Sequence, residues 1–225
     1  MSIAHRDIDD FFWTPVVVFR SSPKFSGRLI IKRIIDVLIS SILLLLGIPL
    51  FMLIALAIKL QSPGPAIFSQ KRSGLNGRIF TLYKFRSMIS EADQKQQELE
   101  RFNEMSGPVF KITNDPRVTK VGKFLRRYSL DELPQLFNVL KGEMSLVGPR
   151  PLPDYEVEKL IGRQRRRLRM RPGLTCLWQI KGRSDVDFHK WMGYDLEYID
   201  NWSLGLDFYI LFNTLFVVFS SKGAY

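Results

Sequence analysis

The longest apolar stretch of the chain runs from Val37 to Ile58 and contains no charged side chain. A stretch of this length can cross a bilayer as one α-helix, so a single spanning helix is the simplest prediction. Pro49 lies near its middle, two residues after Gly47. Proline lacks an amide donor and its ring clashes with the carbonyl four residues earlier, here Leu45. A kink or break is therefore expected at Pro49.

Charges on both sides of this stretch favour a different topology, a hairpin that enters and leaves the membrane on the same side. One basic cluster, residues 28–33, precedes the stretch, and another follows from Lys59 to Arg78. The positive-inside rule would place one of these clusters on the disfavoured side of a spanning helix. Each half of the stretch is also too short to span alone. Both topologies remain open; the hairpin would occupy residues 28–61, after an N-terminal extension of residues 1–27.

The rest of the chain, residues 62–225, predicts a mostly helical α+β domain. It begins at a strong turn signal, Ser62-Pro63-Gly64-Pro65. Apolar and polar residues then alternate from Ala66 to Arg86 around the dipeptide Asn76-Gly77. This pattern is typical of two antiparallel strands joined by a tight turn, so it predicts a small β-hairpin.

Helical spacing of apolar residues predicts two short helices in tandem, one from Val121 to Tyr128 and one from Leu133 to Leu140. Gly142 is the expected C-terminal cap of the second helix. Three further helices are predicted: a polar one at Ser90–Met105, a basic one at Tyr155–Met170 and an apolar one at Leu204–Phe219. The apolar helix is short for a membrane span, so we expect it to lie in the interface or to pack on the domain.

Charge and cysteine content narrow the class of partner. The chain has 225 residues, 33 Lys and Arg against 22 Asp and Glu, and a formal charge of +11. An anionic partner is therefore expected. Cys176 is the only cysteine, so no internal disulfide can form, and neither histidine has zinc-ligand spacing with it. The arginine-rich run 163–169 lacks an accompanying nucleic-acid-binding motif, so lipid phosphates are a better partner for it than nucleic acid.

Two adjacent carboxylates, Asp131 and Glu132, stand at the predicted start of the second tandem helix. One interpretation is a capping box, in which Ser129 caps the helix and Glu132 reaches back to the cap amide. Asp131 is not needed for that box. Free amides and the helix dipole in a first turn keep a carboxylate ionised and also attract phosphate. Glu132 thus has a structural and a chemical interpretation, and Asp131 is the better candidate for a nucleophile.

Several arginines could complete a phosphate site around this turn. Arg126 and Arg127 lie just upstream, and Arg86 and Arg150 flank the unit in sequence. A guanidinium can donate two parallel hydrogen bonds to phosphate, which masks its charge and lets a carboxylate attack phosphorus. A divalent cation held by the adjacent carboxylates is the other usual mask. As a set, these residues favour a phosphate site.

Six short motifs, spread over roughly residues 30–220, are far more specific together than any one of them is alone. They are Lys32-Arg33 with Asp36, Ser62-Pro63-Gly64-Pro65, Lys84-Phe85-Arg86-Ser87-Met88, Ser129-Leu130-Asp131-Glu132-Leu133-Pro134-Gln135, Gly148-Pro149-Arg150-Pro151 and Arg171-Pro172-Gly173. In this order they resemble the bacterial sugar transferases, the monotopic polyprenyl-phosphate phosphoglycosyl transferases that start cell-surface glycan assembly. The chain departs from the family pattern at Cys176, where glycine is common, and at Lys181, where a small polar residue is usual.

The resemblance implies a reaction and roles for the two carboxylates. A UDP-sugar would give its sugar-1-phosphate to undecaprenyl phosphate and release UMP, with Mg²⁺ as the cofactor. Asp131 matches the nucleophile that forms a covalent phosphosugar intermediate. Glu132 matches its partner, which is implicated with Mg²⁺ and in activating the acceptor. Both carboxylates are thus expected as catalytic groups and as metal ligands.

The resemblance also implies a set of cationic substrate contacts. Arg126 falls on the arginine that binds phosphate near the carboxylate pair. Arg150 falls within the Pro-Arg-Pro element tied to the nucleotide sugar. Lys84, Arg86 and Arg183 are the remaining expected contacts to substrate or phosphate.

The implied setting is the cytoplasmic face of the bacterial inner membrane. A re-entrant helix-break-helix with its break at Pro49, together with amphipathic interfacial helices, would hold the catalytic domain of residues 62–225 there. Anionic lipids and a second copy of the chain, forming a homodimer, are further expected partners. The tail through Trp178, Trp191 and Trp202 favours a hexose, glucose or galactose, and hence the first membrane step of exopolysaccharide, capsule or O-antigen synthesis. The rivals are a non-enzymatic adaptor on anionic lipid, a phosphatase and a single-displacement transferase.

Overall fold

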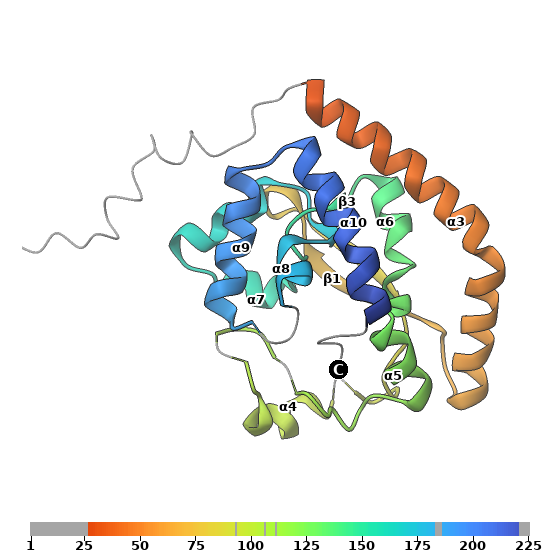
Figure 1. Ribbon diagram of the computed structural model, residues 1–225. Coiled ribbons are helices and arrows are strands. Elements are labelled where there is room, and N and C mark those ends of the chain that lie inside the picture. The colour runs from red at the N-terminus through yellow and green to blue at the C-terminus, as the bar shows by residue number, and fades with distance from the viewer. Residues whose placement is uncertain (1–26, 93, 106, 111, 183–185, 221–225) are drawn as a thin grey trace, which may run out of the picture.

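The computed structural model describes residues 27–92, 94–105, 107–110, 112–182 and 186–220. The predicted N-terminal extension, residues 1–27, lies outside this part of the chain except for Gly27. The fold is mostly helical, as predicted, and it contains two small sheets. Figure 1 shows one long helix following the side of a compact group of shorter helices and strands.

The long helix, α3, runs without interruption from Gly27 to Gln61, with Pro49 inside it. Its path in Figure 1 is curved around the domain. The predicted pair of helices separated by a break is therefore observed as one continuous, bent helix. Proline removes only one hydrogen bond of the helix, and both halves of α3 pack on the domain, which supports the helical backbone on either side of Pro49. By length and composition α3 could cross a membrane.

The predicted β-hairpin is confirmed. Strands β1 (Ile67–Ser73) and β2 (Ile79–Phe85) pair in antiparallel register. The connection between them includes a 3-10 turn, η1 (Leu75–Gly77), in which Asn76 has a φ of 56°. This left-handed conformation is tolerated by asparagine far better than by most residues, which explains why the Asn-Gly signal located the turn correctly.

A second, parallel pair of strands was not predicted from the sequence. Strands β3 (Ser145–Val147) and β4 (Gly173–Thr175) have three residues each, too few for an alternating pattern to stand out. Glycines make their close approach possible. A Cβ on Gly173 would lie 2.0 Å from the amide nitrogen of Gly148, a distance that no side chain can occupy.

The tandem helices are observed, with a later start for the second. Helix α5 spans Lys120–Arg127, α6 spans Gln135–Lys141, and Gly142 ends α6 at a φ of 81°. The other helical elements are α4 (Gln96–Leu99), η2 (Glu100–Phe102), η3 (Leu130–Glu132), α7 (Asp154–Glu158), η4 (Gly162–Arg169), α8 (Leu177–Lys181), α9 (Phe188–Asp200) and α10 (Leu204–Ser220).

Two predicted helices are wrong in extent. The polar segment Ser90–Met105 forms only α4 and η2, because it has no apolar face to pack against the domain. The basic segment Tyr155–Met170 is divided into α7 and the 3-10 helix η4 at Gly162, whose φ is 55°. Two of the arginines in η4, Arg166 and Arg167, are buried, so this segment does not present a continuous basic face to lipid phosphates.

Polar side chains four residues apart attach the first half of α3 to the domain. Lys32, Asp36 and Ser40 share one face of the helix and are all buried. Lys32 Nζ pairs with Asp207 Oδ2 of α10 at 2.7 Å. Asp36 Oδ1 accepts a hydrogen bond from the amide of Leu146, in β3, at 3.0 Å. The start of α3 is thus bonded to two elements that lie more than a hundred residues away in sequence.

Apolar contacts attach the second half of α3 to the same domain. Ile54 and Ile58 are buried in a cluster with Phe85 of β2 and Leu125 of α5. The ring of Phe51 meets that of Phe85 edge to face, with centroids 5.8 Å apart. The two halves of α3 therefore contact different elements of the same domain.

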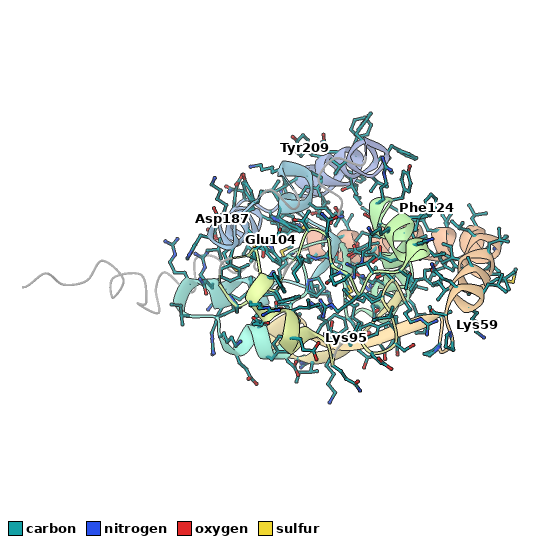
Figure 2. The ribbon with its side chains drawn as sticks, turned by 90° about the horizontal axis from the view of Figure 1, so that it is seen from below. Lys59, Lys95, Glu104, Phe124, Asp187 and Tyr209 are labelled. Carbon is teal, nitrogen blue, oxygen red and sulfur yellow. The ribbon has the colours of Figure 1, made fainter. Side chains whose placement is uncertain are left out.

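Much of the remaining surface of α3 and α10 is apolar. Exposed residues on α3 include Leu45, Leu46 and Leu60, each more than two thirds exposed. On α10 the exposed side chains include several aromatics, among them Tyr209. In Figure 2, Tyr209 of α10 lies toward the upper edge of the molecule and the exposed Lys95 toward the lower edge. An exposed apolar surface of this kind on α3 and α10 is typical of a protein that contacts lipid.

Close packing of α5 on the segment that follows β2 yields a test of the fold. A Cβ on Gly122 would lie 1.9 Å from the Ser87 carbonyl oxygen. We expect Gly122→Ala to lower the free energy of unfolding by about 1–3 kcal/mol, because the backbones must separate. The matched control is Gly193→Ala in α9, where no atom lies within 4 Å of the new methyl group. Thermal or denaturant unfolding measures both, and equal effects would contradict this packing.

Candidate active site

Asp131 and Glu132 lie on the 3-10 turn η3, between α5 and α6. The chain enters this turn through Ser129, at a φ of 54°, and α6 begins only after Pro134, whose φ of −61° suits a helix start. The Ser129 side chain does not cap the turn. The predicted capping box is therefore wrong, and Glu132 has no role in capping a helix. The physical reason is Pro134, which moves the start of the helix beyond both carboxylates.

Glu132 is held by an arginine from another part of the chain. Arg150 Nη2 donates a hydrogen bond to Glu132 Oε1 at 2.5 Å. Burial alone would raise the pKa of Glu132, but Arg150, followed by Lys84 and Arg72, outweighs burial and holds that pKa below its usual value. Glu132 is thus an ionised carboxylate in a fixed position.

Asp131 has a different environment from its neighbour. It is buried, and no hydrogen bond reaches its carboxylate from the described residues. Burial, assisted by the charge of Glu132, raises the pKa of Asp131 to about 6, while Arg126 and Lys84 oppose this shift. Arg126 Nε donates to Ser87 Oγ at 2.9 Å, which orients its guanidinium in this region. Asp131 is therefore the carboxylate that remains available to a ligand.

A cavity of about 300 Å³ shares Lys84 and Arg126 with the surroundings of Asp131. The hairpin contributes Arg72 and Lys84 to its wall, α5 contributes Arg126, and α7 contributes Glu156. Burial lowers the pKa of Lys84 to about 8, with Arg72 and Arg126 adding to the effect. Cations that destabilise one another in this way favour an anionic ligand between them. The volume lies within the range of small-molecule sites.

Arg86 lines the cavity, but its Nη atoms donate to the carbonyls of Pro63 at 2.7 Å and of Ser62 at 2.8 Å. Its observed contacts therefore fix the turn that follows α3. Gly64, at a φ of 108°, leaves the space that this guanidinium occupies. Arg183 lies outside the described residues.

A buried ion pair supports Arg150 from behind. Arg167 Nη2 donates to the Arg150 carbonyl at 2.6 Å and also to Asp195 Oδ2 at 2.6 Å. Trp178 and Trp191 stack with centroids 4.8 Å apart. Arg150 lies over the ring of Trp178 and Arg167 over that of Trp191. These contacts link η4, α8 and α9 to the backbone that presents Arg150 to Glu132.

Sequence reasoning missed Arg72, Glu156 and the ion pair between Arg167 and Asp195 that supports Arg150. Asp195 had a detectable signal, because it interrupts an otherwise apolar face of α9 that includes Trp191 and Tyr198. A carboxylate at such a position requires a cationic partner. Arg72 and Glu156 had no comparable signal, because the β1–β2 hairpin and α7 are far apart in sequence and come together only in the folded chain.

The carboxylate pair fits a hard divalent cation. Within the described part of the chain no group of three or more His, Cys, Asp or Glu side chains converges on one point. Mg²⁺ is commonly held by one or two carboxylates, with water and substrate phosphates completing its coordination. Asp131 and Glu132 provide two carboxylates of that kind.

Comparisons with known proteins agree with these observations. The sequence model of a family described as bacterial sugar transferase matches residues 27–221. The chain is 45% identical to the galactosyl transferase CpsE of Streptococcus agalactiae, over 99% of this chain and 50% of that protein. It is 46% identical to the exopolysaccharide production protein ExoY of Rhizobium meliloti, over 86% of this chain and 88% of that protein.

A third relative is the UDP-glucose:undecaprenyl-phosphate glucose-1-phosphate transferase of Escherichia coli, 41% identical over 100% of this chain and 48% of that protein. The chain thus spans about half the length of two of these three relatives and most of the length of ExoY. The matched family is the one that the six motifs indicate.

The support for Arg150 can be tested through stability. Asp195→Ala leaves Arg167 charged and unpaired at a buried site, so we expect the free energy of unfolding to fall by about 3–5 kcal/mol. Glu197→Ala, on the same helix, removes a surface pair with Lys181 and should cost less than about 1 kcal/mol. Denaturant unfolding of both variants in detergent gives the comparison. Similar losses would mean that the buried pair contributes no special support.

Proposed function

The chain belongs to the bacterial sugar transferase family, and from this premise we propose that it transfers a sugar-1-phosphate from a UDP-sugar to undecaprenyl phosphate. One observation supports this reaction above all. Asp131 is a buried carboxylate without a hydrogen-bond partner among the described residues, and it interacts electrostatically with Lys84 and Arg126 of the cavity wall, while its neighbour Glu132 is fixed by Arg150. A carboxylate kept available beside phosphate-binding groups is the arrangement that nucleophilic attack on phosphorus requires.

The cationic cavity is proposed to bind the diphosphate of the donor. Lys84 and Arg126 line it and interact electrostatically with Asp131, so a phosphate bound between them would lie close to the nucleophile. Neutralised phosphate oxygens repel an attacking carboxylate less. Binding of the anion would also relieve the mutual repulsion of these two cations and Arg72.

In the first step, an oxygen of the Asp131 carboxylate attacks the phosphorus that carries the sugar. A bond forms between them, the bond from this phosphorus to the bridging oxygen breaks, and UMP leaves with the electron pair. In the second step, a phosphate oxygen of undecaprenyl phosphate attacks the same phosphorus. The bond to Asp131 breaks, the carboxylate is regenerated, and the lipid diphosphate sugar is released. Each step exchanges one phosphorus–oxygen bond for another.

Glu132 and Asp131 are proposed to hold Mg²⁺, which would neutralise phosphate charge when bound. Glu132 is also suited to orienting the acceptor phosphate, because its own position is fixed by Arg150. Arg150 and the Asp195–Arg167 pair behind it keep the carboxylate from moving as substrates bind and leave.

The proposed location is the cytoplasmic face of the inner membrane, with α3 entering and leaving on the same side. Support comes from the packing of α3: its start is bonded to α10 and β3, and its end packs on β2 and α5 of the same domain. A helix spanning the bilayer would have its ends on opposite sides, and one soluble domain could not contact both. The exposed apolar residues of α3 and α10 supply the lipid-facing surface.

The proposed sugar is a hexose, glucose or galactose. CpsE is named a galactosyl transferase and the Escherichia coli relative acts on UDP-glucose by name. The reaction would then be the first membrane step of an exopolysaccharide, capsule or O-antigen pathway.

A donor assay tests the covalent mechanism. Full-length protein in membranes, given a UDP-hexose, undecaprenyl phosphate and Mg²⁺, should release UMP, and Asp131→Asn should lower the rate by more than about 10³-fold because the nucleophile is lost. Asp154→Asn, on the surface of α7, is the control and should retain activity. Donor alone should leave a phosphosugar attached to Asp131, detectable by mass spectrometry of the intact protein.

The outcomes of this assay separate the rivals. A lipid-docking adaptor would release no UMP. A single-displacement transferase would turn over without a covalent adduct, and a phosphatase would release UMP over many turnovers without the lipid acceptor, where the proposed enzyme releases at most one UMP per site. Unchanged turnover in Asp131→Asn would exclude this residue as the nucleophile.

Membrane topology can be tested with a cysteine at position 28 and another at position 71, both exposed in the native chain as Arg28 and Lys71. A re-entrant α3 predicts that a membrane-impermeant maleimide labels both positions from the cytoplasmic side only. The native Cys176 is buried, so the unmodified protein is the background control. Labelling of the two positions from opposite sides would instead establish a spanning helix.

A further inference from the structure

Glu156 is an acidic residue in an otherwise cationic cavity, and the proposed reaction does not use it. It lies on the short helix α7 and lines the cavity together with Lys84 and Arg126. The residue is only 5% exposed, and its carboxylate forms no hydrogen bond or ion pair with the described residues. Burial raises the pKa of Glu156 to about 7, although Arg72 and Arg167 oppose the shift.

A buried carboxylate without a partner is costly to the fold. Arg72, the charge that acts most strongly on Glu156, already donates to the Pro151 carbonyl at 3.0 Å and to Gln70 Oε1 at 2.7 Å. It is therefore committed to the loop after β3 and to its own strand. Glu156 lines the cavity, so a ligand bound there can supply the missing hydrogen bonds in place of water.

The chemistry of the proposed ligand limits which of its groups could donate hydrogen bonds to Glu156. A carboxylate beside the diphosphate-binding cations would repel phosphate, so Glu156 does not contact that part of a nucleotide sugar. The donor has two neutral parts rich in hydroxyl groups, the ribose and the hexose, and acidic side chains commonly accept hydrogen bonds from such hydroxyls. Phe68 and Phe110, which also line the cavity, offer apolar faces for the rings of the same ligand.

We propose that Glu156 forms a hydroxyl-recognition subsite in the donor cavity, accepting hydrogen bonds from hydroxyl groups of the bound nucleotide sugar. This inference rests on the proposed function, because it assumes that the cavity binds the donor. The subsite sets specificity for the donor and takes no part in the bond exchange at phosphorus. A donor that lacks the recognised hydroxyl leaves the carboxylate buried and unpaired, so it should bind about ten- to a hundredfold more weakly.

The test compares donors with and without single hydroxyls, on the full-length protein in membranes. One arm uses UDP-hexose and its 2′-deoxyribose and 3′-deoxyribose counterparts, and the other uses UDP-hexoses lacking one hydroxyl of the sugar. UMP release gives kcat/KM for each donor. Wild-type protein should disfavour at least one deoxy donor by tenfold or more, and the arm in which this occurs identifies the part of the donor that is recognised.

Two variants assign the discrimination to a residue. Glu156→Gln keeps the shape of the side chain but removes its charge and replaces one acceptor oxygen by a donor, and should reduce the discrimination to less than about threefold, mainly by raising KM for the complete donor. Glu158→Gln, an exposed position on the same helix, should leave it unchanged. Discrimination that persists in Glu156→Gln overturns the proposal.

Wild-type protein alone also provides a decisive result. If it releases UMP from every deoxy donor as efficiently as from the complete one, the subsite does not exist, whether or not Glu156→Gln folds. If it releases no UMP from any UDP-hexose, the proposed function itself fails. The two failures are therefore distinguished before any variant is made.

Discussion

The ion pair between Arg150 and Glu132 joins the two segments from which the site is built, and the other charges are arranged around it. One partner comes from the turn between α5 and α6, and the other from the loop after β3, 18 residues later. Because Arg150 neutralises Glu132, the two adjacent carboxylates differ in character, one fixed and ionised and the other buried without a partner. Adjacent carboxylates with equal surroundings would repel each other and share their protons. Here the ion pair between Arg150 and Glu132 gives the two carboxylates different properties.

This difference between the two carboxylates depends on contacts with distant parts of the chain that hold Arg150 and Arg126 in position. Arg150 is fixed through its backbone carbonyl by Arg167, which is itself fixed by Asp195 of α9. On the other side, Gly122 allows α5 to contact the Ser87 backbone, and Ser87 in turn orients Arg126. The groups nearest the substrates therefore stand on packed elements, although the residues themselves lie in turns and loops. Such support is what allows charges to be organised before substrate binds.

The sequence was informative about local structure and less so about the surroundings of the proposed site. Asn76-Gly77 located the hairpin and Gly142 the end of α6, because these residues answer local backbone needs. Asp131 was correctly predicted to have no capping role. The capping box proposed for Glu132 was wrong, because Pro134 moves the start of α6 beyond both carboxylates. The partners of Glu132 and Arg150 depend on contacts between segments far apart in sequence, and no local pattern encodes them. The burial of Arg166 and Arg167 could not be predicted for the same reason. A run of arginines is expected to be solvated unless its acidic partners elsewhere in the chain are known.

The polar stripe of Lys32, Asp36 and Ser40 determines which face of α3 is turned outward. An apolar helix in hydrocarbon has little preference for one rotation about its own axis, because lipid tails surround it uniformly. The stripe removes that freedom, since rotating the helix by one residue, about 100°, would move these side chains away from β3 and α10 toward lipid. The leucines and isoleucines that face outward therefore follow from the directions in which Lys32 and Asp36 form their bonds. In the proposed membrane location, the rotation of α3 about its axis, and with it the depth of the domain, would be set by side chains that face the protein.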